Sequence, residues 1–182
     1  MTKPTYLDSK KKHLVRSIML RRVKKFNRVV GLAGPDINQY LNTFKDMGVK
    51  EFEVYEKDKQ VFINQLRTIR GHRIQLKYMD ILKADADAPK TLFDLDFCAT
   101  IKHLKEHVVK FKDNFIMTFS LRGFSEKDTL KSFFSWRGEQ ICEVERVKCD
   151  SLWYNLIHTK QGGSYLQINY FDTSPMFCIS KL

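Results

Sequence analysis

The chain has 182 residues, 43% of them hydrophobic, and 32 Lys and Arg stand against 21 Asp and Glu, a formal net charge of +11. This length suits one domain, and the apolar content is enough to bury a core, which excludes a wholly disordered chain. The longest uncharged apolar runs are strand-sized, so we expect no membrane-spanning helix. The excess of cations favours contact with nucleic acid, although a basic solubilising surface would have the same composition.

The number and spacing of the cysteines indicate the cellular compartment in which the protein is expected. The four cysteines are far apart, form no Cys-x-x-Cys pair and follow no secretory leader: Cys98, Cys142, Cys149 and Cys178. This pattern predicts free thiols in a reducing compartment. We therefore expect a cytoplasmic protein, or one held with nucleic acid in a nucleoid or nucleus.

Residues 1–27 form a basic segment in which apolar residues recur at helical spacing, which predicts a helix over about 9–25 that packs on a domain spanning 28–182. Cations cover the rest of this helix and are expected to contact nucleic-acid phosphates; the alternative is a solvated face. They are Lys10, Lys11, Lys12, Arg16, Arg21 and Arg22, with Arg67, Arg70, His72 and Arg73 as further phosphate contacts.

Strands then alternate with helices along the chain. The apolar run over 28–34, which ends in glycines, predicts a buried strand that leads into a turn. The hydrophobic patterns predict further strands over 52–58, 74–82, 91–97 and 114–122, and helices over 35–44, 61–69, 101–111 and 125–138. One further helix is expected over 141–156, although 152–159 would suit a strand equally well. Residues 164–172 and 176–182 read as a closing hairpin.

Alternation of this kind requires right-handed crossovers and a parallel sheet. We therefore predict a Rossmann-like three-layer α/β sandwich, with a mostly parallel seven-stranded sheet and a C-terminal antiparallel hairpin.

Ligands of an open α/β sheet bind beyond the carboxyl ends of the strands, where the strand order reverses. After the first strand, Gly31, Ala33 and Gly34 would let the backbone approach a ligand closely, and Asp36 follows them. At the end of the second strand, Glu56 could accept hydrogen bonds from both hydroxyls of a ribose.

The next two strands also end in acids. Asp80 follows the third strand, where it could accept from an adenine amino group. Asp94 and Asp96 end the fourth strand, where a carboxylate could orient a nucleophilic amine or accept its proton; the alternative is a helix-capping acid. Phe97 could stack on a base or belong to the core. Arg122, after the fifth strand, is predicted to be a cation on the substrate side.

Metal binding is not expected. His103 and His107 can share a helix face, but no nearby Cys or carboxylate pattern completes a site.

In their order, four of these segments resemble the motifs of the class I SAM-dependent methyltransferases. VVGLAGPD is similar to the glycine-rich motif, EVYEKD to the ribose-binding acid, YMDIL to the adenine-binding acid, and FDLDFCAT to the fourth motif, which borders the acceptor pocket. The resemblance implies S-adenosylmethionine (SAM) as cofactor. The likeness of Asp94-Leu95-Asp96-Phe97 to an Asp-Leu-Asp-Pro-Phe-Gly segment implies a nucleic-acid acceptor. The family's acid in the first motif is missing here, and Val30 occupies its approximate position.

Two functions from different classes remain open after this reading. The first is a SAM-dependent methyltransferase acting on nucleic acid. The second is a methyltransferase-like fold without turnover that serves as a nucleic-acid-binding or assembly module. The absence of a Gly-x-Gly-x-x-Gly loop disfavours a nicotinamide dinucleotide. No separate recognition domain fits in this length, so the basic surface or a protein partner would supply target specificity.

Overall fold

A computed structural model describes residues 10–23, 26–45, 47–70, 73–85, 90–100, 111, 115–120, 126–149 and 152–169. The elements in chain order are α1 (Lys10–Leu20), β1 (Arg28–Gly31), α2 (Ile37–Lys45), β2 (Glu51–Glu56), α3 (Lys59–Thr68), β3 (Ile74–Tyr78), the 3-10 helix η1 (Ile81–Lys83), β4 (Thr91–Thr100), β5 (Phe115–Ser120), α5 (Glu126–Trp136), β6 (Ile141–Cys149), β7 (Leu152–Thr159) and β8 (Ser164–Asn169). None of the helices in these ranges is long and apolar enough to cross a membrane.

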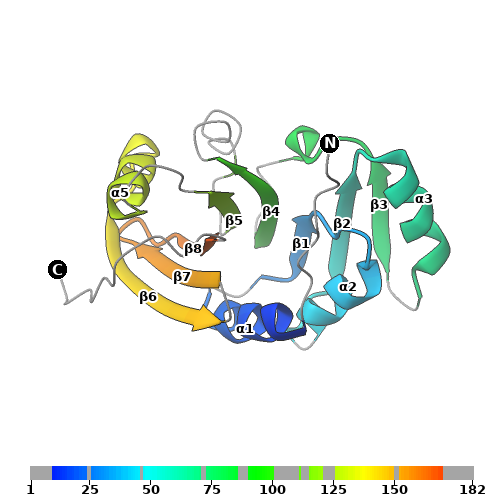
Figure 1. The fold of residues 1–182 in the computed structure, drawn as a ribbon, viewed down its shortest axis with the longest axis horizontal. Helices are drawn as coiled ribbons and strands as arrows, with labels where there is room; N and C mark the ends of the chain where they lie inside the picture. The colour runs from blue at the N-terminus through cyan, green and yellow to red at the C-terminus, as the bar shows by residue number, and fades with distance from the viewer. Residues whose placement is uncertain are drawn as a thin grey trace.

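The described strands form one sheet of eight in the order β3-β2-β1-β4-β5-β8-β7-β6 (Figure 1). Neighbours from β3 to β8 pair in parallel, whereas β6, β7 and β8 form an antiparallel meander. The chain runs outward from β1 to β3 and then returns to the other side of β1 at β4. This reversal is the doubly wound topology of a Rossmann-like fold, which confirms the predicted class. The predicted number of seven strands is wrong.

The predicted helix over 141–156 is also wrong, because this segment forms β6 and most of β7. Tyr154 and Leu156 pack on one face of the sheet and Ile157 on the other, and all three are buried. A strand buried on both faces has no clean apolar–polar alternation, so its apolar residues can also fall at helical spacing. Gly162 has a φ of 84° in the turn between β7 and β8, where its N–H donates to the Thr159 carbonyl at 2.9 Å.

The other elements agree with the prediction within a few residues at their ends. α1 is shorter than the expected helix and ends at Leu20. β8 is the first strand of the predicted closing hairpin, but it pairs with β5 and β7. The predicted strand over 176–182 lies outside the described residues, as does the predicted helix over 101–111 except for Phe111.

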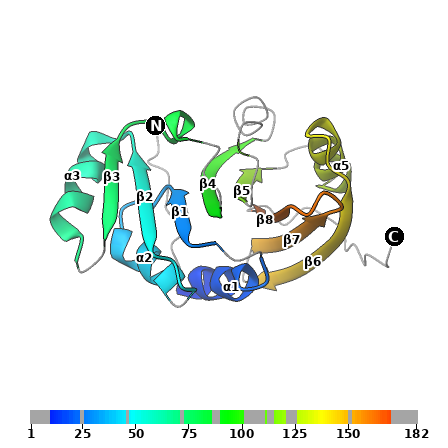
Figure 2. The same cartoon turned by 180° about the vertical axis from the view of Figure 1, so that it is seen from behind.

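Two apolar clusters occupy the two faces of the sheet. On the first, called the α1/α2 face, Leu20 and Phe44 bring α1 and α2 against Val54 of β2. On the second, the α5 face, Phe134 of α5 packs near Tyr165, with their ring centroids 5.0 Å apart. Figure 2, seen from behind, shows α5 over the end of the sheet that holds β6 and away from α1 and α2. Burying an aliphatic or aromatic side chain contributes roughly 1.5–3 kcal/mol, so both faces stabilise the sheet.

Candidate functional site at the carboxyl edge of the sheet

The register of the parallel strands brings the predicted site segments to one edge of the sheet. Gly31, the last residue of β1, pairs with Val54 of β2 on one side and Asp94 of β4 on the other. Glu56, the last residue of β2, pairs with Tyr78, the last residue of β3. The turn after β1, Glu56 and the segment after β3 therefore leave the sheet at the same edge, next to the point between β1 and β4 where the strand order reverses.

The turn after β1 is shaped by contacts with α2 and α3. Gly34 has a φ of 65°, a left-handed conformation that favours glycine, and its carbonyl accepts a hydrogen bond from the Gln65 amide of α3 at 2.5 Å. Ala33 is buried. Asp36 is exposed and accepts from the Gln39 N–H at 3.0 Å, so its carboxylate caps α2.

Gly31 is required by packing rather than by ligand approach. A Cβ at this position would lie 2.6 Å from the Cβ of Asp94 and closer still to the Tyr40 hydroxyl. The space that was assigned to a ligand on this side of the glycine therefore belongs to two side chains of the protein. The prediction for Gly31 is corrected accordingly.

Glu56 is a half-buried carboxyl group at the end of β2. Burial raises its pKa above the ordinary value, and the negative charge of Asp58 acts in the same direction. The Asp58 N–H opposes this shift in part, since it donates to Glu56 Oε1 at 2.7 Å. Asp58 in turn caps α3 by accepting from the Gln60 and Val61 N–H groups at 2.8 and 3.0 Å. These hydrogen bonds fix the backbone just after Glu56.

Asp80 also acts as a helix cap. Its Oδ1 accepts from the Leu82 N–H at 3.0 Å at the start of η1, the position in which a short polar side chain satisfies a helix amide. It lies two residues after β3, which ends earlier than the predicted strand over 74–82. A ligand at this edge would therefore compete with η1 for one of the Asp80 oxygens.

Asp94 is wholly buried, and its carboxylate forms an ion pair with the guanidinium of Arg16, whose side chain is 4% exposed. The pair lies on the α1/α2 face, where the Arg16 guanidinium carbon is 5.9 Å from the ring centroid of Phe44. Two predictions are corrected by this contact. Asp94 is not placed to orient an acceptor amine, and Arg16 is buried and therefore not on the surface that was expected to contact phosphates.

The remaining predicted residues divide into two groups. Arg21 and Arg22 are exposed at the end of α1, and Arg22 forms an ion pair with Glu145 of β6. Arg67, Arg70 and Arg73 are exposed as well, and their contact with phosphates stays a prediction. The others have side chains outside the described part of the structure, so their roles also stay predictions: Lys10, Lys11, Lys12, His72, Asp96, Phe97 and Arg122. His103 and His107 also lie outside it.

Sequence reasoning missed a polar cluster on the α5 face. Glu53 of β2 is 4% exposed and accepts hydrogen bonds from Arg28 of β1, Lys77 of β3 and the Tyr55 hydroxyl. Burial opposes ionisation of Glu53, but these three donors together outweigh it, so the pKa of Glu53 lies below its ordinary value. Lys77 and Arg28 lie on β3 and β1, the strands on either side of β2, so this cluster can be recognised only once the strand order and register are known.

Together, the reversal of strand order and the four carboxyl ends define a Rossmann-like α/β protein whose candidate ligand site lies at the carboxyl edge between β1 and β4. No protein-family model matches the sequence, and no curated protein matches it either. Among solved structures, the chain is similar to M. jannaschii TYW2 in complex with AdoMet, at 14% identity and a TM-score of 0.49, over 84% of this chain and 76% of that chain.

Two further solved structures are similar at lower scores. CalS10, a SAM-bound amino pentose methyltransferase from Micromonospora echinaspora, is 10% identical with a TM-score of 0.44, over 86% of this chain and 73% of its own. A SAM-dependent methyltransferase from Clostridium acetobutylicum is 10% identical with a TM-score of 0.40, over 84% of this chain and 62% of its own, so the present chain spans less than two thirds of that protein. The fold assignment is carried by the sheet topology and not by these similarities.

Proposed function

We propose that this chain is a SAM-dependent methyltransferase that acts on nucleic acid. The observation that carries the proposal is the arrangement at the carboxyl edge, where a half-buried carboxyl group, Glu56, ends the strand next to the glycine-containing turn after β1. In a doubly wound sheet this is the place at which an acid binds the ribose of an adenosine-containing cofactor. The motif order of the sequence and the net charge of +11 add support for the cofactor and for the acceptor respectively.

The described residues fit such a cofactor at its ribose end. Glu56 is only half-buried, so its carboxylate is accessible to hydroxyl donors, and the hydrogen bond from the Asp58 N–H holds it in place. Gly34 supplies the tight turn that the loop after β1 needs. We assign the ribose hydroxyls to Glu56 and the adenine amino group to Asp80.

SAM would supply a methyl group activated by a sulfonium. Displacement at such a carbon needs little acid or base help, so the protein's own contribution is to align the acceptor. Because Arg16 engages Asp94, we assign the orienting carboxylate to Asp96, two residues further along β4. Base stacking stays assigned to Phe97.

A second candidate is the methyltransferase-like fold without turnover, and a specific observation favours it. The buried pair of Arg16 and Asp94 removes one of the two β4 carboxylates from acceptor chemistry, and protein side chains fill the space beside Gly31. Cofactor binding separates the two candidates.

The test is calorimetric titration of the purified chain with SAM and S-adenosylhomocysteine, with NAD as comparator. We expect micromolar binding of the first two and none of NAD. Glu56→Ala should weaken SAM binding at least tenfold, about 1.4 kcal/mol, whereas Glu51→Ala, an exposed acid at the other end of β2, should leave it unchanged. No heat with either SAM or S-adenosylhomocysteine, from folded protein, would favour the second candidate. Methyl transfer to RNA or DNA from isotopically labelled SAM then tests the acceptor.

A further inference from the structure

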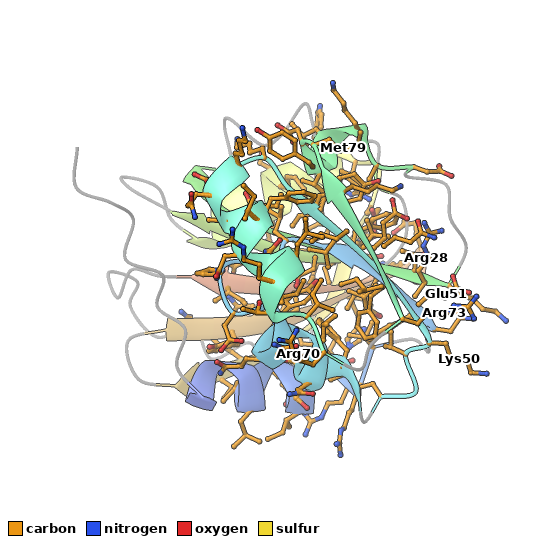
Figure 3. All side chains as sticks on the ribbon, turned by 90° about the vertical axis from the view of Figure 1, so that its right-hand side faces the viewer. Arg28, Lys50, Glu51, Arg70, Arg73 and Met79 are labelled. Atoms are coloured by element: carbon orange, nitrogen blue, oxygen red, sulfur yellow. The ribbon has the colours of Figure 1, made fainter. Side chains whose placement is uncertain are left out.

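Cations gather at the amino edge of the sheet, the end opposite the candidate site. Lys90 precedes β4, Arg28 begins β1, Lys50 precedes β2, and Arg73 precedes β3. We call these four residues the amino-edge cluster. Figure 3 shows Arg28, Lys50 and Arg73 together with Glu51 on one side of the molecule, and Met79 at the other end of β3.

Backbone contacts fix the segments that carry the cluster. The Asn27 N–H donates to the Lys90 carbonyl at 3.1 Å, and the Lys50 N–H donates to the Asn27 carbonyl at 2.8 Å. Arg73 comes directly before Ile74, which pairs with Phe52. The four cations therefore follow the strand order β3-β2-β1-β4, and with neighbouring strands about 4.8 Å apart they form a row of roughly 14 Å.

Most of the positive charge in this row is not neutralised within the described part of the chain. Lys50, Arg73 and Lys90 are exposed, and no described carboxylate lies within ion-pair distance of them. Glu53 is buried and already binds Arg28 and Lys77, whose side chains remain 28% and 38% exposed. Among the described residues, the four cations of the amino-edge cluster are thus accompanied by two carboxylates, Glu51 and Glu53, and Glu53 is shared with Lys77 of β3.

A row of fixed cations about 14 Å long fits the phosphate backbone of a nucleic acid, which carries one charge per roughly 3.4 Å of each strand. We propose that the amino-edge cluster binds this backbone. The proposal rests on the nucleic-acid part of the proposed function and adds where the acceptor is held. β2 spans six residues, about 20 Å, so this surface lies too far from the carboxyl edge to present the reacting base. It would hold a distant part of a long acceptor, and phosphate contacts of this kind position without reading sequence.

The test measures nucleic-acid binding in the absence of cofactor. A negative result would therefore concern the amino-edge cluster and would not bear on SAM binding. Fluorescence anisotropy would follow a labelled 25-base-pair DNA duplex and a labelled 25-nucleotide single-stranded RNA across a range of salt concentrations. The edge variant is Lys50→Gln/Arg73→Gln/Lys90→Gln. The matched control, Lys83→Gln/Lys131→Gln/Lys160→Gln, removes the same charge from exposed positions on η1, on α5 and in the turn between β7 and β8.

For whichever probe binds, we expect the edge variant to lose at least tenfold in affinity at about 100 mM salt. The slope of log K against log salt should flatten by about 2–3, because each lost phosphate contact contributes roughly 0.7–0.9. The control should change the affinity less than threefold. Equal losses in the two variants would show that total charge and not this edge determines binding, and would overturn the proposal. Absence of binding by the unmodified chain to both probes would overturn it as well.

Discussion

Arg16 of α1 and Asp94 of β4 form an ion pair in which both side chains are buried, although the two residues are 78 positions apart in the chain. The contact ties the N-terminal helix to the strand beside the reversal of strand order. Both ions lose their hydration here, so the pair as a whole is not strongly stabilising. Its value lies in specificity, because Asp94 would be a buried carboxylate without this guanidinium if α1 packed in another register.

The first prediction follows from the burial of both charged groups of this ion pair. Arg16→Met should lower the free energy of unfolding by about 3–5 kcal/mol, because it leaves the carboxylate of Asp94 buried without the guanidinium. Asp94→Asn should also destabilise the protein. The double variant should recover part of the loss, since neither charge then remains. Urea unfolding of the four proteins gives the coupling energy, which we expect to be at least about 1 kcal/mol. Additive losses would mean that the two side chains act independently.

Sequence reasoning predicted the parts of this protein that depend on chain order. Alternating strands and helices led to the doubly wound topology, and the topology placed the turn at Gly34 next to Glu56 at one edge. It did not predict contacts that depend on which face a side chain occupies. Arg16 has the sequence character of a surface cation, and only the packing of α1 on α2 directs it to Asp94.

The β6–β7 segment shows a second limit of such reasoning. In a strand with both faces covered, Leu156 and Ile157 are both buried, so neither the helical nor the strand period is distinct. The sheet continues beyond β8 with β7 and then β6. No local sequence pattern encodes this choice of partner strands.

The second prediction concerns Glu53, which binds Arg28, Tyr55 and Lys77. Glu53→Gln should lower the free energy of unfolding at pH 7 by about 1–2 kcal/mol, a modest loss because Arg28 and Lys77 still reach solvent. The pKa of Glu53 is lowered on folding, so its ionised form contributes stability above the unfolded-state pKa. That contribution is lost as the pH falls through the folded-state pKa.

The difference between Glu53→Gln and the unmodified protein should therefore be constant near neutrality and shrink below about pH 4.5, the ordinary value for this carboxyl. Urea unfolding at several pH values between about 3 and 7 measures it. Glu51→Gln, an exposed neighbour on the same strand, should change stability by less than about 0.5 kcal/mol. A pH-independent difference would show that the ionisation of Glu53 does not contribute.

The third prediction concerns Gly31. A methyl group at this position would overlap Tyr40 and Asp94, so Gly31→Ala should destabilise the fold by about 1–3 kcal/mol through overpacking. Gly48→Ala is the control, because a Cβ there meets no atom within 4 Å and the substitution costs only the strain of a φ of 75°, about 1 kcal/mol. Thermal unfolding of both variants measures which substitution causes the larger loss of stability. A smaller loss at Gly31 than at Gly48 would mean that β1 shifts easily, which would leave space for a ligand beside it.

The last prediction links the electrostatics of Glu56 to cofactor binding. A ribose requires the ionised carboxylate as a double acceptor, and burial together with the charge of Asp58 raises the pKa of Glu56. SAM affinity should therefore fall as the pH is lowered through the raised pKa of Glu56, because the protonated group has lost one of its acceptor positions. In Glu56→Gln the affinity should be at least tenfold weaker at pH 7.5 and should stay nearly constant down to about pH 5. Calorimetric titration across this range compares the two proteins. If the variant kept the same pH dependence as the unmodified chain, the proton would belong to another group, and the ribose would have to be assigned away from Glu56.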